Sequence, residues 1–284
     1  MEKGLTWIEL KEGFSNRGCP ICNILAQGTR RYFSFFLDES ILDPDTRLQL
    51  IESVGWCVRH TLLLLTIESR EWPDHMGSAT IFESLLQATQ RRLTETQRKL
   101  RPLPPSAKER AWQRIATRIA DSLQARRSCP VCESETARES SFQGFFVSTL
   151  FDPALGQEMK ELYLGSEGLC YRHLIGCIGR CASPEQIGEL LETEQQKLGA
   201  LVSEVSDYLR KHEHRYHHEA FGEEIDAWAR AARKLAGQQL ENANLRQLID
   251  LSRRREKRQS VDSAPVEACN IQDEKERTND EDSH

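Results

Sequence analysis

The spacing of apolar residues along this chain is helical almost throughout. From Pro20 to about Leu37 they recur at helical intervals, which predicts an amphipathic helix. Pro20 suits its first turn, where a missing N–H leaves no bond unmade. Asp43 before Pro44 predicts a cap and the start of a short second helix, which Gly55 ends. No segment alternates convincingly as a strand, so the predicted fold class is all-α.

The same pattern predicts further helices. They are a helix from Cys57 through Leu65, a long helix carrying Ile81, Leu85 and Leu93, a helix capped by Ser106 and carrying Trp112 and Ile115, and a helix capped by Ser183 that runs to about Tyr208. Trp112 and Trp228 are expected to anchor cores. Beyond about Leu251 the chain becomes polar and charged, which predicts a disordered tail over residues 252–284.

Composition narrows the class of protein. The 284 residues leave room for one large or two small domains, and 38% hydrophobic residues suffice for a modest core. A formal net charge of −6 argues against nucleic acid as a partner, because non-specific binding needs a basic face. The longest apolar run, around Leu62 to Leu65, is too short for a membrane span. With no signal peptide visible at the N-terminus, we expect a cytoplasmic protein.

Two near-copies of one ligand pattern stand out. The first is Cys19-Pro20-Ile21-Cys22 followed by Cys57-Val58-Arg59-His60, and the second is Cys129-Pro130-Val131-Cys132 followed by Cys170-Tyr171-Arg172-His173. The first cysteine pairs are offset by 110 residues, and the Cys-x-x-His segments by 113. Such agreement is hard to explain as chance placement.

Each copy offers three thiols and one imidazole, the ligand set of a closed tetrahedral zinc site. We therefore predict one site from Cys19, Cys22, Cys57 and His60, and another from Cys129, Cys132, Cys170 and His173. Two zinc ions per chain are expected, with an iron–sulfur cluster as the alternative, since thiolates serve both metals. In a reducing compartment, paired Cys-x-x-Cys spacing favours metal binding over disulfides.

Other residues agree once the ligands are aligned. They are Phe35-Phe36 with Phe145-Phe146, Asp43-Pro44 with Asp152-Pro153, Gly55 with Gly168, and Ala111-Trp112 with Ala227-Trp228. We infer a tandem duplication of a helical unit over residues 17–127 and 128–240, each unit closed by its own Cys3His site. Duplicated units commonly pack about a pseudo-two-fold axis.

Several polar residues have two interpretations. Cys177 and Cys181 are either spare ligands or a redox pair, or, as we favour, small buried hydrophobes. The histidines His212, His214, His217 and His218 are either a weak metal site or a solvated helix end, which we favour. Arg59 and Arg172 either bond a thiolate or an anionic partner, or are solvated helix positions.

The doubled Cys-Pro-x-Cys and Gly-x-Cys-x-x-His motifs, with Asp226-Ala227-Trp228 near the end, resemble a family of uncharacterised bacterial and archaeal proteins. That family is a domain of unknown function with paired cysteine motifs, and the likeness covers about residues 13 to 240. The resemblance implies a helical, metal-bearing fold and no particular activity.

These observations lead to one functional hypothesis and one alternative. The first is a cytoplasmic scaffold with two structural zinc sites that presents a surface to a protein partner. The alternative is a thiol-based redox or metal sensor, in which oxidation of a Cys3His site loosens the fold. The sequence shows no nucleophile–base arrangement, phosphate loop or open metal site that would favour an enzyme.

Overall fold

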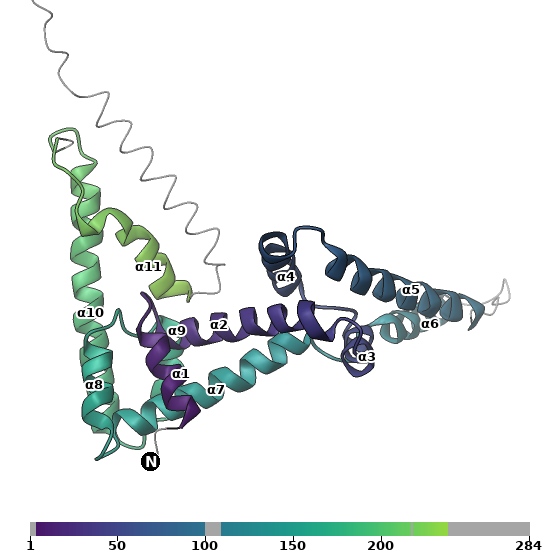
Figure 1. Cartoon of the computed structure of the whole chain (residues 1–284), viewed down its shortest axis with the longest axis horizontal. Helices are drawn as coiled ribbons and strands as arrows, with labels where there is room; N and C mark the ends of the chain where they lie inside the picture. The colour runs from purple at the N-terminus through teal and green to yellow at the C-terminus, as the bar shows by residue number, and fades with distance from the viewer. Residues whose placement is uncertain (1–3, 100–108, 217, 238–284) are drawn as a thin grey trace, which may run out of the picture. The chain divides into compact units, whose positions relative to one another are not determined.

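The computed structural model describes residues 4–99, 109–216 and 218–237, and every regular element within them is a helix (Figure 1). The prediction of an all-α fold is confirmed. Ser106, His217 and the predicted tail over residues 252–284, which includes the ninth cysteine, Cys269, lie outside the described residues.

The helices begin and end close to the predicted signals. The first half contains α1 (Leu5–Phe14), α2 (Pro20–Phe35), the π-helix η1 (Phe36–Ser40), α3 (Pro44–Ser53), α4 (Val58–Glu71), α5 (Met76–Lys99) and α6 (Glu109–Leu123). The second half contains α7 (Pro130–Leu150), α8 (Gly156–Leu164), α9 (Tyr171–Ile178), α10 (Pro184–Lys211), the 3-10 helix η2 (Glu223–Asp226) and α11 (Ala227–Ala236).

Local sequence explains the helix ends. The Asp43 carboxylate accepts a bond of 2.7 Å from the Thr46 N–H, as expected of an N-cap. The Ser183 hydroxyl accepts one from the Gln186 N–H. Gly55, with φ of 86°, follows α3 in the left-handed region, where a side chain would be strained. Helix α1 was not predicted, although Trp7 and Leu10 bury one of its faces.

Helices α2 and α7 pack against each other in opposite directions (Figure 1). The Thr29 hydroxyl, late in α2, donates a 2.6 Å bond to Glu135, early in α7. At the opposite ends, Ile21 of α2 and Phe146 of α7 belong to one buried cluster. The start of each helix therefore lies beside the end of the other.

This antiparallel pair joins two hydrophobic cores. The first core combines the start of α2 and the end of α7 with α1, α8, α9 and α10. The second combines the end of α2 and the start of α7 with α3, α4 and α5. Both cores draw on both halves of the chain, and residues 1–242 form one compact unit. Duplication of the sequence over 17–127 and 128–240 stays a prediction.

Neither of the two tryptophans expected to anchor a core is fully buried. Trp112 is 47% exposed and Trp228 is only partly buried. Helix α6, which carries Trp112, packs against α5, whereas α11 packs against both α9 and α10. The buried tryptophans are instead Trp7 and Trp56. An amphipathic pattern identifies an apolar face but not whether a second element covers it.

Candidate metal centres

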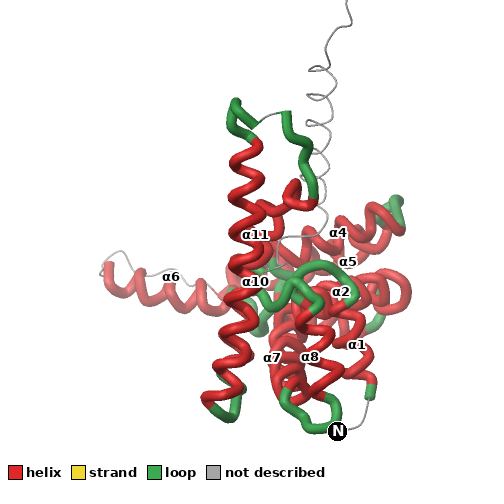
Figure 2. Tube along the Cα trace, turned by 90° about the vertical axis from the view of Figure 1, so that its left-hand side faces the viewer, coloured by secondary structure: helices red, strands yellow, loops and turns green. Residues whose placement is uncertain are grey.

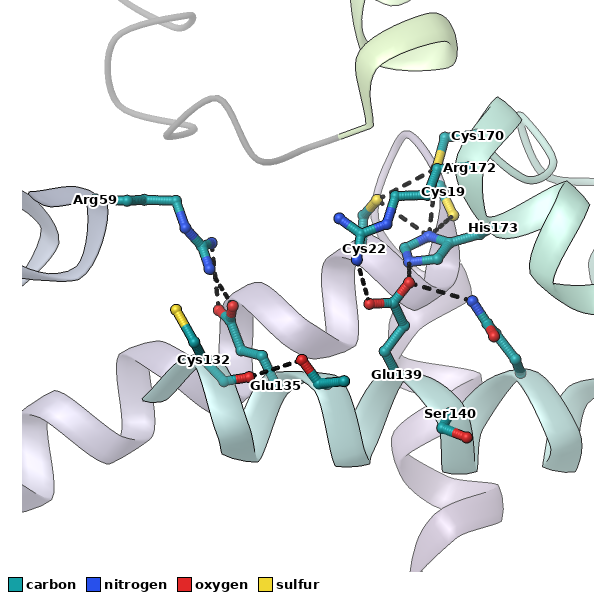
Figure 3. Close-up of polar contacts among 12 residues, drawn as sticks. Cys19, Cys22, Arg59, Cys132, Glu135, Glu139, Ser140, Cys170, Arg172 and His173 are labelled. Atoms are coloured by element: carbon teal, nitrogen blue, oxygen red, sulfur yellow. Dashed lines mark hydrogen bonds and ion pairs between the residues drawn. The ribbon is translucent and has the colours of Figure 1, made fainter. Parts of the chain in front are cut away.

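The first group of ligands, site A, contains Cys19, Cys22, Cys170 and His173 (Figure 3). Cys19 is the N-cap of α2 and Cys22 lies in its first turn, while Cys170 is the N-cap of α9 and His173 lies in that helix's first turn. All four residues are buried. Two helix N-termini therefore converge on one point, where their dipoles favour thiolates.

The second group, site B, contains Cys57, His60, Cys129 and Cys132. Here the N-termini of α4 and α7 converge, with Cys57 and Cys129 as the N-caps. His60 is fully buried, but the three cysteines are only partly buried. The two sites thus share the same ligand types and the same helix geometry but differ in exposure.

All eight predicted ligands come together in two groups of four, but the predicted pairing within each repeat is wrong. The Cys-Pro-x-Cys pair of each half joins the Cys-x-x-His pair of the other half. The physical reason is length, since α2, at 16 residues, carries the chain about 24 Å away from Cys22. The 10-residue α3 spans only about 15 Å and cannot bring it back. The antiparallel α7 instead delivers Cys129 and Cys132 to the far end of α2.

The separations of the ligand atoms fit a single tetrahedral ion. Cys22 Sγ lies 3.7 Å from Cys170 Sγ in site A, and Cys57 Sγ lies 3.6 Å from Cys132 Sγ in site B. A zinc ion with Zn–S bonds of about 2.3 Å places its sulfurs about 3.8 Å apart. A disulfide would need about 2.05 Å, so these cysteines are free thiols.

Both histidines turn Nδ1 toward the sulfurs. His173 Nδ1 lies 3.2 Å, 3.4 Å and 3.3 Å from the Sγ atoms of Cys19, Cys22 and Cys170. In site B, His60 Nδ1 lies 3.3 to 3.4 Å from its three sulfurs. A tetrahedral zinc with a Zn–N bond of about 2.0 Å predicts about 3.5 Å for this separation. The ring orientation therefore suits coordination through Nδ1.

A carboxylate on α7 lies behind each imidazole. Glu139 Oε1 lies 3.3 Å from His173 Nε2, and Glu135 Oε1 lies 3.2 Å from His60 Nε2. Carboxylates in this position fix the ring and raise the basicity of a ligating histidine. The same glutamates bind the neighbouring arginines, with Arg172 Nη2 2.5 Å from Glu139 and Arg59 paired with Glu135 (Figure 3).

Sequence reasoning missed both glutamates. They stand one helical turn apart on α7, where Glu residues are ordinarily exposed, and no partner is visible from the chain alone. The signal that pointed toward them was Arg59 and Arg172, one residue before each histidine. Of the two interpretations given to these arginines, the structure supports a bonding role. Each arginine binds the glutamate that contacts the ligating histidine, rather than mainly a thiolate.

Without metal, the ligand side chains of site B have very different pKa values. Burial opposes a charged imidazole, but hydrogen bonds to Cys129 and Glu135 outweigh it and raise the pKa of His60 to about 9. Burial also opposes a thiolate, yet the bond to His60 lowers the pKa of Cys129 to about 6. Burial and the Cys57 thiol raise the pKa of Cys132 to about 12.

Site A follows the same pattern. Hydrogen bonds from Cys19 and Cys22 lower the pKa of Cys170, while burial raises that of Cys19. Burial opposes the charged form of His173, but bonds to Cys170 and Cys22 raise its pKa to about 10. Without metal, each site would therefore favour one thiolate–imidazolium pair. A divalent ion must displace the remaining protons, so affinity falls as the pH falls.

The additional cysteines and histidines lie outside both groups. Cys177 is fully buried in the first core, where burial raises its pKa, as expected of a small hydrophobe. Cys181 is partly buried, and its Sγ lies 3.6 Å from the Cys177 carbonyl oxygen. His212 packs against the rings of both Tyr208 and Phe221. The metal-binding groups found among the described residues include neither these cysteines nor His212, His214 and His218.

The two sites differ in the elements that pack over them. Helix α11 packs against α9, and Gly237 at its end closes over site A. A Cβ atom at Gly237 would lie 3.5 Å from Cys170 Sγ and 3.8 Å from Cys22 Sγ. Helix α1 closes another side, with Gly13 against Pro20 and Ile24. Site B has only partly buried cysteines.

Comparison with known proteins places the chain in a family. Residues 1–242 match the model of a family described as "Family of unknown function (DUF6062)". The chain belongs to this family. It is also 24% identical over 229 residues to an uncharacterized 23.9 kDa protein in the xynA 3' region of Caldicellulosiruptor sp. (strain Rt8B.4), covering 80% of this chain and 99% of that protein.

The family match confirms the resemblance drawn from the motifs and extends it over α1. No solved structure matches the chain. The function is therefore argued from the two centres themselves.

No helix in the described ranges combines the length and the apolar character that crossing a bilayer requires.

Proposed function

We propose that this chain is a zinc protein in which two structural zinc ions tie its halves together. The observation that carries this proposal is the pair of four-ligand groups at tetrahedral spacing, each drawn from both halves. Four protein ligands leave no open position for a substrate, whereas catalytic zinc normally keeps one. Each ion would therefore act as a cross-link between helix N-termini.

Zinc is favoured over an iron–sulfur cluster on size. A cluster binds its thiolates through different irons with sulfides between them, which requires a wider cage than one ion. Within each group all the ligand atoms lie within 4.8 Å of one another. One imidazole among three thiolates is also a common structural zinc set.

The experiment that tests this assignment is elemental analysis of protein purified without added metal, together with a visible spectrum. We expect about two zinc ions per chain and no visible absorbance, since zinc has a filled d shell. Iron with labile sulfide, or a brown colour, would replace the zinc assignment by a cluster.

The proposal extends to a scaffold role, in which the chain binds a protein partner in the cytoplasm. Its support is a set of exposed apolar side chains on the α5–α6 pair, which are Leu86, Leu93 and Trp112 at 70%, 52% and 47% exposed. Apolar groups gathered on one pair of helices favour contact with another protein. A partner captured by the parent chain but lost from Leu86→Ser with Trp112→Ser, while zinc content stays at two, would support this role.

A thiol-based sensor at site B is the second candidate. The observation favouring it is the partial exposure of Cys57, Cys129 and Cys132, because oxidants reach exposed thiols first. Buried Cys177, with its raised pKa, makes a poor resolving thiol beside site A. Peroxide titration with a colorimetric chelator tests the idea. Fast release of one zinc, reversed by reductant and absent in Cys57→Ser, would favour the sensor over the scaffold.

A further inference from the structure

A cavity of about 200 Å³ lies against site A, with Cys19 and Cys170 in its wall. Its other walls come from α10, α11 and the loop before Cys170. The volume is below the roughly 300 Å³ at which pockets for drug-sized ligands begin. A ligand of this cavity would therefore be small, and it would lie next to the metal ligands.

More cationic than anionic side chains line the cavity. The cations are Lys197, Arg230, Arg233 and Lys234, and the carboxylates are Glu167 and Glu204. Most of these charges already have partners. Arg230 pairs with Glu204 and Asp226, Lys234 Nζ lies 2.5 Å from Glu194, and Glu167 pairs with Arg17.

Among the described residues, two cations have no carboxylate within salt-bridge distance, although Glu194 acts on Lys197 and both Glu167 and Asp226 act on Arg233 from farther away. Lys197 Nζ donates to the carbonyl oxygens of Leu164 and Ser166, at 2.8 Å and 2.6 Å, and these acceptors carry no net charge. Arg233 has a buried Nε without any acceptor. Burial also lowers the pKa of Arg233, since desolvation disfavours its charged form. A guanidinium with no carboxylate bonded to it keeps N–H donors that can bind an oxyanion.

The charges around the cavity nearly cancel. With Arg17, Glu194 and Asp226 included, five cations face four carboxylates. A zinc ion with three thiolates and a neutral imidazole carries one net negative charge, so the cluster is close to neutral when site A is filled. An anion here would therefore be held by local hydrogen bonds from Arg233 and Lys197 rather than by an excess of positive charge.

We propose that this cavity binds a small oxyanion, a carboxylate or a phosphate, through Arg233 and Lys197. The guanidinium fork of Arg233 matches the paired oxygens of either group, and the Lys197 ammonium adds a point charge. Binding would stabilise α11 over site A, because Arg233 lies on α11 and Lys197 on α10. This activity goes beyond the structural zinc role and does not depend on which protein partner the chain has.

No equivalent site is found among residues 4–99 and 109–127, the described part of the first half. In the alignment that matches Trp112 with Trp228, Thr117 takes the place of Arg233. Helix α6, which carries Thr117, packs against α5, whereas α11 packs against both α9 and α10. The proposed oxyanion site therefore belongs to site A alone.

The test titrates the full, metal-loaded chain with inorganic phosphate and separately with acetate, against sodium chloride at matched ionic strength. Thermal unfolding and isothermal calorimetry supply the readouts, and metal content is checked after each titration. We expect saturable binding of one anion per chain and a rise in the unfolding midpoint above the chloride control. The response to phosphate or to acetate tells which oxyanion the cavity prefers.

Arg233→Gln should weaken this binding at least tenfold, because it removes the guanidinium that would donate to the anion. The matched control is Arg118→Gln, which removes one charge from an exposed position on α6 and should bind as the parent does. Ala200→Asp supplies a second variant, since Ala200 is exposed at the cavity edge and the change adds a negative charge without breaking an ion pair. It should abolish binding.

Two results would overturn the proposal. One is that neither anion raises the midpoint above chloride. The other is that Ala200→Asp binds as tightly as the parent, which decides the matter even if Arg233→Gln does not fold. Loss of anion binding with two zinc ions retained would leave the structural zinc proposal intact.

Discussion

Site A and site B use the same four ligand types on the same kind of helix N-terminus, yet they differ in access. In site A all four ligands are buried, with α1 and α11 packed around them. In site B only His60 is buried. Ligand chemistry therefore does not set how a metal is reached. Access is set by the surrounding helices, which differ between the two sites.

The comparison also shows what a shared motif leaves undetermined. Both histidines have a glutamate behind them, but both glutamates come from α7. In site B this helix also supplies Cys129 and Cys132, while in site A it supplies no ligand. The two sites thus have the same ligand types, but α7 contributes to them in different ways.

The largest expected effect tests which cysteines share a metal. Cys22→Ser with Cys170→Ser removes two ligands from site A, so we expect one zinc ion to remain. Cys22→Ser with Cys57→Ser removes one ligand from each site, and we expect the loss of both ions and of most thermal stability, because metal-binding energy is folding energy here. Elemental analysis after gel filtration measures the result. If instead the first double variant lost both ions and the second kept one, the ligands would be paired within each repeat.

The second prediction concerns the difference in access. With excess chelator, zinc should leave site B at least tenfold faster than site A, since a chelator reaches partly exposed thiolates without opening the core. Cys57→Ser retains only site A and Cys22→Ser only site B, so each rate can be measured separately by absorbance of a zinc-binding dye. Equal rates in the two variants would mean that the covering helices do not limit release.

The third prediction compares the supporting carboxylates. Glu139→Gln and Glu135→Gln should each weaken zinc binding at one site by roughly 10- to 100-fold, because each removes the charge behind a ligating imidazole. Glu133→Gln on the same helix is the control, since that side chain is 43% exposed and pairs with Arg127. Dye competition gives the affinities. If the control weakens binding as much, the effect is one of net charge.

A fourth prediction separates ligands from neighbouring thiols at site A. Cys177→Ser should keep two zinc ions but lower the free energy of unfolding by about 1–3 kcal/mol, because it buries a hydroxyl in an apolar core. Cys181→Ser should keep both the metal and nearly all the stability. Chemical denaturation with metal analysis checks both. Loss of zinc in either variant would add that cysteine to the ligand set.

The smallest effect is expected at Trp112, the exposed tryptophan on α6. Trp112→Ala should change the free energy of unfolding by less than about 1 kcal/mol, since an exposed side chain loses little on truncation. Trp7→Ala, in the core beside site A, should cost about 3–5 kcal/mol. Urea unfolding of both variants measures the contrast. Equal losses would show that another element covers Trp112.

The sequence predicted local features well and long-range ones poorly. Helix starts at Pro20, Pro44 and Pro184 follow from caps and proline positions, which act within one turn. The ligand residues follow from motif spacing. The exchange of ligand pairs between the two halves does not follow from motif spacing. It depends on α2 and α7 lying antiparallel, and nothing within either motif specifies that packing. The lengths of α2 and α3, read together, were the available clue.

The exposure of Trp112 and the roles of Glu135 and Glu139 were missed for a related reason. An apolar or charged position on a helix acquires its role from whatever lies opposite, and that partner is distant in the chain. Glu139, for example, stands 33 residues before the arginine that it binds.

The exchange of ligands also constrains how a newly made chain can acquire metal. A chain grows from its N-terminus, and both sites take half of their ligands from beyond residue 128. The first half alone therefore closes neither site. Site B becomes complete once Cys132 has emerged, and site A only after His173. A chain interrupted between these two points would carry one metal ion, and one interrupted before Cys129 would carry none, so metal content would record how far synthesis had proceeded.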